Sequence, residues 1–212
     1  GTSDFVARLI AQKITGTLGQ QLIVENRPGI VQAEIASKAP PDGYTLLISG
    51  GIVWITPLLQ KTVYDPVRDF SPITMVERSP NILAVHPSLP VKSVKELIAL
   101  AKARPAELNY STSGIATSPH LSTELFNAMA GVKTVHVPYK GNGPGVNALI
   151  AGEVQLTISS ATSLTPFIKS GRLRGLAVTS AEPSALAPGL PTVSASGLPG
   201  YESVGITGAF AP

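Results

Sequence analysis

The sequence predicts an α/β fold with a mainly parallel sheet. Short apolar runs typical of strands alternate with segments of helical period along most of the 212-residue chain. The strand candidates are continuous apolar runs, the pattern of parallel strands that helices cover on both faces. Small-residue loops connect several of these strands to the following helix, as in βα units. The chain length is that of one large domain or two small ones.

The first third of the chain is predicted to contain two helices and two strands whose ends are marked by glycine and proline. The expected elements are a helix over 4–18, a short buried strand over 22–25, a short helix over 33–38 and a strand over 44–48. Gly19 ends the first helix. Prolines at 57, 66 and 72 interrupt the next stretch, so we expect no long helix or strand there.

The remaining two thirds alternate regularly between strands and helices. The best-defined helix covers 93–103, because Ser93 and Glu96 have the spacing of a capping box. The other expected elements are strands over 82–85, 108–111, 134–138, 154–159, 176–179 and 204–209, and helices over 118–130, 143–151 and 164–170. The first helix has no strand before it, and the last strand ends the chain abruptly. We therefore expect that the sequence is the interior of a longer protein.

Composition excludes several classes of function. Cysteine is absent, which rules out disulfides, thiolate metal sites and cysteine nucleophiles. A net charge of +3 with only 14% charged residues argues against a nucleic-acid partner. No apolar run has the roughly 18 residues of a transmembrane helix, and no signal-peptide pattern is visible.

Small-residue loops that precede helices are the candidate binding sites. Such loops leave free N–H groups at the positive end of the helix dipole, and small side chains let an anion approach the backbone. The candidates are the opening Gly1-Thr2-Ser3-Asp4, the loop Ser49-Gly50-Gly51 and the loop from Ser113-Gly114 to Thr117. Ordinary helix capping is the alternative at each of them. His120, near a helix start, either binds a ligand or serves in packing.

Motifs for catalysis, nucleotides and metals are absent or incomplete. The pair Ser113-Gly114 lacks the preceding glycine of the G-x-S-x-G nucleophile elbow. The run Gly141-Asn142-Gly143-Pro144-Gly145 does not have the dinucleotide spacing, and there is no P-loop. The histidines do not have metal-binding spacing, so no metal or cofactor is expected. His86 directly precedes Pro87 and His136 lies two residues before Pro138, both at strand ends, and we expect both histidines to be structural.

Strings of residues over nearly the whole chain carry a family resemblance. The most specific are Glu25-Asn26-Arg27-Pro28-Gly29 and Pro41-Asp42-Gly43-Tyr44-Thr45-Leu46-Leu47. Others are Tyr64-Asp65-Pro66, Tyr110-Ser111-Thr112-Ser113-Gly114 and Val137-Pro138-Tyr139-Lys140-Gly141. Together they resemble the periplasmic solute-binding receptors of the tripartite tricarboxylate transporter family, often called Bug receptors.

The resemblance implies a two-lobed periplasmic-binding-protein fold of the type II-like, Venus-flytrap kind, with a two-segment hinge. Lobe one would hold residues 1–80 with 204–212 returning to it, and lobe two residues 81–203. A monomeric, periplasmic, non-enzymatic receptor would capture a small carboxylate between the lobes and deliver it, through transient contact, to membrane transporter subunits. The implied ligand-binding residues are Thr2, Ser3, Asp4, Ser49, Gly50, Gly51, Ser113, Gly114, Ala116, Thr117, His120 and Ser160, with Asp4 favoured as a helix cap.

The sequence departs from the family pattern in places that bear on the ligand. Ile30 directly follows the Asn-Arg-Pro-Gly turn, where the family has a longer glycine-rich stretch, so a segment after Gly29 is expected to be missing. Ser160 and Ala161 stand where the family often has an aspartate, which favours a ligand without an ammonium group. The loop at Ser49 is also unusual in lacking threonine and asparagine. A ligand-sensing receptor that signals to a membrane partner, a regulator's effector domain and a small α/β enzyme are the alternatives.

Overall fold

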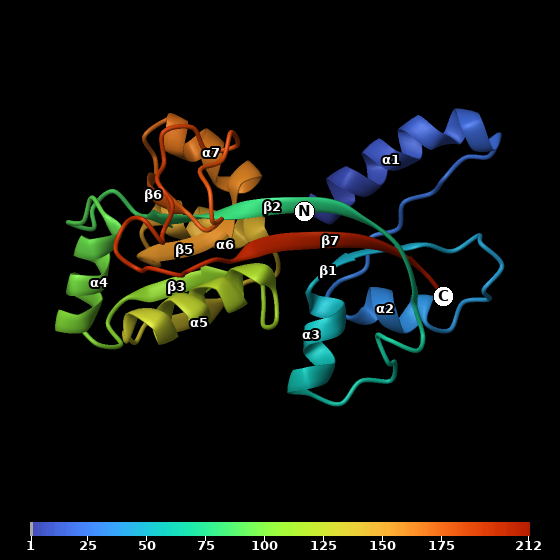
Figure 1. Ribbon diagram of the computed structural model, residues 1–212, viewed down its shortest axis with the longest axis horizontal. Helices are drawn as coiled ribbons and strands as arrows, with labels where there is room; N and C mark the ends of the chain where they lie inside the picture. Colours follow the sequence, from blue (N-terminus) through green and yellow to red (C-terminus); the bar gives the residue numbers. More distant parts are fainter. Residues whose placement is uncertain (1) are drawn as a thin grey trace. The chain divides into compact units, whose positions relative to one another are not determined.

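The chain forms two compact units in the computed structural model, which describes residues 2–212 (Figure 1). Unit 1 comprises the residues up to Arg78 together with Ile206–Pro212, and unit 2 is the continuous segment Ser79–Gly205. The chain passes from unit 1 to unit 2 within strand β2 (Ser71–Val85) and returns within strand β7 (Val204–Ala211). Among residues 2–212, no helix is long and apolar enough to cross a membrane.

Unit 1 consists of three helices and a small sheet. The helices are α1 (Thr2–Leu18), α2 (Val31–Ala36) and α3 (Ile52–Leu59), and strand β1 (Leu47–Gly50) pairs antiparallel with β7 in the order β1-β7-β2. A small apolar core joins α2, β1 and α3 to the loop that follows them, and its buried members are Ala33, Ala36, Leu47, Val53, Tyr64 and Phe70.

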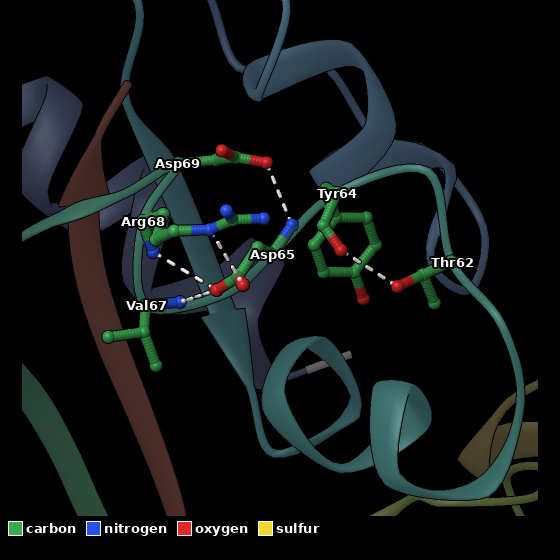
Figure 2. Close-up of polar contacts among 6 residues, drawn as sticks. All are labelled: Thr62, Tyr64, Asp65, Val67, Arg68 and Asp69. Atoms are coloured by element: carbon green, nitrogen blue, oxygen red, sulfur yellow. Dashed lines mark hydrogen bonds and ion pairs between the residues drawn. The ribbon is translucent and has the colours of Figure 1, made fainter.

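The loop after α3 is held by two aspartates (Figure 2). The Asp65 carboxylate accepts hydrogen bonds from the backbone N–H groups of Val67 at 2.9 Å and Arg68 at 3.1 Å. The Asp69 carboxylate accepts from the Asp65 N–H at 2.7 Å. The backbone donors lower the pKa of Asp65, since they stabilise its charged form. The turn thereby fixes the position of Tyr64, which it follows directly.

Tyr64 compensates for a proline inside helix α3. Pro57 has no N–H to donate to the carbonyl of Val53, four residues earlier. The hydroxyl of Tyr64 donates to that carbonyl at 2.8 Å, and both side chains are almost completely buried. The helix therefore continues through Pro57 with its freed carbonyl paired.

Substituting Tyr64→Phe is expected to destabilise unit 1 by about 1–3 kcal/mol, because it leaves a buried carbonyl without a donor. Urea unfolding followed by Trp54 fluorescence measures this. Pro57→Ala is the matched partner, since it restores an N–H at the position that the carbonyl faces. The loss caused by Tyr64→Phe is expected to shrink in the Pro57→Ala background, and an equal loss in both backgrounds would contradict the pairing.

Unit 2 is a mixed sheet in the order β2-β5-β3-β4, with β6 on the other side of β2. The additional strands are β3 (Asn109–Thr112), β4 (Val135–Pro138), β5 (Leu156–Ser160) and β6 (Arg174–Val178). Strand β3 is parallel to β4 and β5, whereas β2 is antiparallel to β5 and β6. The α/β class is confirmed, but the expected parallel order covers only β5, β3 and β4, since β2 enters from unit 1 in the opposite direction.

Helices cover both faces of this sheet. They are α4 (Val94–Ala103), α5 (Ser118–Ala130), α6 (Asn142–Ala151) and α7 (Ala161–Lys169). Along β2, Leu83 and Val85 belong to a core shared with α4 and α5, while Ile82 and Ala84 belong to a core shared with α6 and α7. Burial on both faces explains why the strands are continuous apolar runs in the sequence.

Local sequence signals failed in three places in and near unit 1. The predicted strand over 22–25 has no strand pairing, and Ile23 is 82% exposed. The strand predicted over 44–48 begins only at Leu47, as β1, and Tyr44 lies before it and is 91% exposed. Helix α3 and the first half of β2 lie in the proline-rich stretch where no long element was expected. Pro57 is tolerated through Tyr64, and Pro72 stands next to the start of β2, where a missing N–H costs little.

Candidate functional site

Three helix N-termini gather at one edge of the unit 2 sheet. Strands β5, β3 and β4 are parallel neighbours, and each leads directly into a helix: β3 into α5, β4 into α6 and β5 into α7. The carboxyl ends of these strands, and the helix starts that follow them, therefore lie at the same edge. None of the three helices has a side-chain N-cap hydrogen bond, whereas α4 is capped by Ser93 at 3.2 Å. The N–H groups of the first turns thus lack side-chain acceptors, which favours an anion over ordinary capping.

A polar pocket lies at this edge. It is lined by Ser111, Thr112, Ser113, Asn142, Gly145, Val146, Thr157 and Ser159, and is too narrow to admit a water molecule in this conformation. Its lining has hydroxyl and amide groups but no charged side chain. The Oδ1 atom of Asn142 is buried without a hydrogen-bond partner. A Cβ on Gly145 would lie 3.4 Å from the Cβ of Ser111, so glycine allows α6 to approach β3 closely.

The loop between β3 and α5 is held in a shape that requires special backbone angles. Gly114 has a φ of +128°, and Ala116, which is buried, has a φ of +62°. The Gly114 N–H donates to Thr112 Oγ1 at 3.2 Å, and Thr117 Oγ1 donates to the Gly114 carbonyl at 2.6 Å. Thr117 is the N-cap residue of α5, but its hydroxyl is used inside the loop. The structure thus brings Ser113, Gly114, Ala116 and Thr117 together.

Two histidine rings lie against each other beside this loop. The ring of His120, in the first turn of α5, lies 4.5 Å from that of His136 on β4, and its Nδ1 is buried without a partner. His136 Nε2 lies 2.6 Å from Thr112 Oγ1. Burial first, and then His120, lower the pKa of His136, because both disfavour its charged form. His136 was expected to be structural only, yet it directly contacts a pocket residue.

Ser160, also expected to bind the ligand, lies at the same edge of the sheet as the N-cap residue of α7. Its hydroxyl is 2.7 Å from that of Ser163, so it is engaged within its own helix start. The sequence reasoning did not identify Thr112, Asn142 or His136. For Asn142, the sequence signal was the surrounding glycine-rich run, since glycines allow one backbone segment to approach another closely. In the sequence this run was tested only as a nucleotide-binding motif.

The other expected residues belong to unit 1. Ser49 is 1% exposed, and its hydroxyl has no partner. Gly50 ends β1, where a Cβ would lie 3.3 Å from the Ile206 carbonyl oxygen. Gly51 is the N-cap of α3, again without a side-chain cap. This is the same combination of a strand end, a small residue and an uncapped helix as in unit 2.

The opening of the chain forms the first turn of α1. Gly1 lies outside the described residues, and Thr2 and Ser3 start the helix. The carboxylate of Asp4 accepts from Asn26 Nδ2 at 2.7 Å and from Arg8 Nε at 2.9 Å. The amide donor of Asn26, and to a smaller extent Arg8, lower the pKa of Asp4. Asp4 is therefore occupied by protein donors. Within residues 2–212, no cluster of three or more metal-ligating side chains is present.

Comparisons with known proteins agree with this architecture. The receptor family of the tripartite tricarboxylate transporters matches residues 6–212. A UPF0065 protein from the tcbD-tcbE intergenic region of Pseudomonas sp. (strain P51) is 37% identical over the whole chain, and BugT of Bordetella pertussis is 34% identical over 95% of it. The chain spans 65% and 64% of the length of these two relatives.

Solved structures are similar over nearly the whole chain. A protein of R. palustris solved with adipate is 39% identical with a TM-score of 0.91, over 100% of this chain and 73% of its own. MatC from Rhodopseudomonas palustris with bound malate is 29% identical with a TM-score of 0.90, over 99% and 73%. The periplasmic binding protein BugD is 32% identical with a TM-score of 0.91, over 100% of this chain and 72% of its own. The chain belongs to the receptor family of the tripartite tricarboxylate transporters.

Proposed function

We propose that the chain is the ligand-binding part of a periplasmic receptor that captures a small organic carboxylate and delivers it to membrane subunits of a tripartite transporter. Units 1 and 2 would serve as its two lobes, joined through β2 and β7. The observation that carries the proposal is the set of three uncapped helix N-termini at one sheet edge in unit 2. Relatives of similar structure hold adipate and malate, both dicarboxylates.

The physics of such a site requires no cation. A micromolar affinity corresponds to about 8 kcal/mol. Hydrogen bonds to a charged group contribute roughly 1.5–3 kcal/mol each, so four to six backbone and hydroxyl donors suffice. Backbone N–H groups at the three helix starts, with the hydroxyl of Ser113, supply such donors in unit 2. We assign the corresponding role in unit 1 to Ser49, Gly50 and Gly51.

The same pocket argues against a ligand with an ammonium group. Its lining includes no carboxylate that could pair with a cation, and Ser160 and Ala161 stand at the end of β5. Burying an unpaired cation is costly, so an amino acid would bind less well than the corresponding plain or hydroxy acid.

A thermal-shift series on the full-length protein tests the proposal. Adipate, malate and a tricarboxylate are compared with an amino acid and with adipamide, which keeps the length of adipate without its charge. An acid at 100 times its Kd adds about 2.7 kcal/mol and raises Tm visibly. We expect at least one acid to raise Tm while adipamide does not. A folded protein whose Tm no acid changes would contradict the proposal.

A further inference from the structure

The pair His120–His136 is the principal titratable cluster near the candidate loop. The ring of His136 on β4 stacks on that of Tyr110 on β3, with their centroids 5.0 Å apart. Its centroid lies 4.5 Å from that of the His120 ring on α5. The carboxylate of Glu124 on α5 raises the pKa of His136, against the effects of burial and His120, and accepts a hydrogen bond from the Tyr110 hydroxyl. The set therefore holds two imidazoles, one phenol and one carboxylate. Because the ring of His120 lies against that of His136, it disfavours the charged form of His136 and helps to lower the pKa of that ring.

A chain of short contacts connects His136 to the loop. Its Nε2 lies 2.6 Å from Thr112 Oγ1, and the same oxygen accepts from the Gly114 N–H. Thr112 Oγ1 also lies 3.4 Å from the Gly114 carbonyl oxygen. That oxygen already accepts a hydrogen bond from Thr117 Oγ1 at 2.6 Å. The contact with His136 is thus the short one that fixes the Thr112 hydroxyl. Thr112 in turn holds the backbone N–H of Gly114, the residue at which the positive-φ turn begins.

We propose that His136 positions the anion-binding loop through Thr112 and takes up a proton when a carboxylate binds there. This inference rests on the proposed function of the same loop. The pocket beside the loop has no lysine or arginine in its lining, and His136 contacts one of its lining residues, Thr112. A carboxylate bound there would therefore place an unneutralised negative charge near the His136 ring. Without ligand, burial and the second histidine keep the pKa of His136 below its usual value. The incoming charge favours the imidazolium, so the pKa of His136 is higher in the complex.

The sign of the pH effect follows from linkage. A group whose pKa rises on ligand binding takes up protons as the ligand binds. Affinity must then increase as pH falls from about 8 to about 6, a range in which carboxylates stay ionised. A purely structural histidine would change stability with pH but would leave the affinity for the acid unchanged.

Calorimetric titration of the full-length protein with adipate and with malate tests this. Each acid is titrated at pH 6 and 8 in two buffers of different ionisation enthalpy, which counts the protons taken up. We expect the wild type to bind roughly threefold to tenfold more tightly at pH 6, with net proton uptake, since a histidine pKa that rises by about one on binding changes the affinity by at most tenfold. His136→Gln keeps a polar group to contact Thr112 but cannot take the proton, so its affinity is expected not to change with pH and its binding to take up no proton.

Two further comparisons separate positioning from folding. Thr112→Val removes the hydroxyl and is expected to weaken binding about tenfold at both pH values, while Thr112→Ser restores it. His86→Gln is the control, because His86 pairs with Ser88 and lies against Gly152, outside the loop and the pocket. It should keep the pH dependence of the wild type.

The possible failures are distinct. Binding with no pH dependence and no proton uptake, or a His136→Gln variant that keeps both, overturns the inference and leaves the proposed function standing. Equal binding by Thr112→Val and wild type overturns the positioning role. If neither acid, nor any other acid of the thermal-shift series, binds to the folded wild type at either pH, the proposed function fails and the inference fails with it.

Discussion

Replacing Phe126 by alanine is expected to destabilise unit 2 by about 3–5 kcal/mol. The Phe126 ring has no exposed surface, lies edge-on to Tyr201 at a centroid distance of 6.3 Å and belongs to the core between the sheet, α4 and α5. Its removal loses both the transfer energy of the ring and the packing around the cavity that is left. The same helix carries the loop and His120 at its start, so ligand binding should weaken together with stability.

The single tryptophan allows this loss to be assigned to one unit. Trp54 lies in unit 1, so its fluorescence in urea reports that unit, whereas far-UV circular dichroism reports both. We expect the dichroism transition of Phe126→Ala to move to lower urea while the Trp54 transition moves less. Leu125→Ala, at a neighbouring position that is 38% exposed, should cost less than about 1 kcal/mol. Equal losses in the two variants would show that Phe126 is not a principal core residue.

Replacing Gly114 by alanine is expected to lower the affinity for the carboxylate ligand by about 10- to 100-fold. The φ of +128° at Gly114 is one that residues with a Cβ rarely adopt, and forcing it costs of the order of 1–3 kcal/mol. An added Cβ would meet only Thr117 Cγ2, at 3.8 Å, so the effect is backbone strain and not a clash. The loop can relieve the strain by changing shape, which displaces the N–H groups that we assign to the anion.

Gly189→Ala is the matched control for this change. Gly189 has a φ of +84°, has open space around its Cβ position and belongs to the same unit. Both variants are expected to lose comparable stability in thermal unfolding, but only Gly114→Ala should lose affinity for the acid in titration. A Gly114→Ala variant that binds as well as Gly189→Ala would remove the loop from the site.

Elements with local signals were predictable from the sequence. Helix α5 has the predicted bounds, since Pro119 and the positive-φ Gly131 mark its two ends. Ser93 caps α4 as predicted, because the Glu96 N–H three positions on donates to its hydroxyl, whereas the Glu96 carboxylate accepts from the Lys92 N–H, one residue before the N-cap. Helix α3 was missed because the group that tolerates its proline is a distant hydroxyl, that of Tyr64, which no local pattern reveals.

The candidate site divides in the same way. The small-residue loops are visible in the sequence because glycine and serine mark the strand-to-helix turns. The contact between Thr112 and His136 spans 24 positions and depends on which strand lies beside β3. The missing side-chain caps are equally hidden, since Thr117 has the residue type of an N-cap but donates elsewhere. Tertiary pairing, and not residue type, decides these features.

Because the chain enters and leaves unit 2 once each, unit 2 has the connectivity of an inserted domain. It is one uninterrupted segment, and its two ends are adjacent: a Cβ on Gly205 would lie 3.6 Å from the carbonyl oxygen of Ser79. A domain whose ends meet can be inserted into, or removed from, a host without stretching either. Recombination or gene design can therefore exchange the entire edge that carries the three helix starts in a single step, while unit 1 keeps its own core.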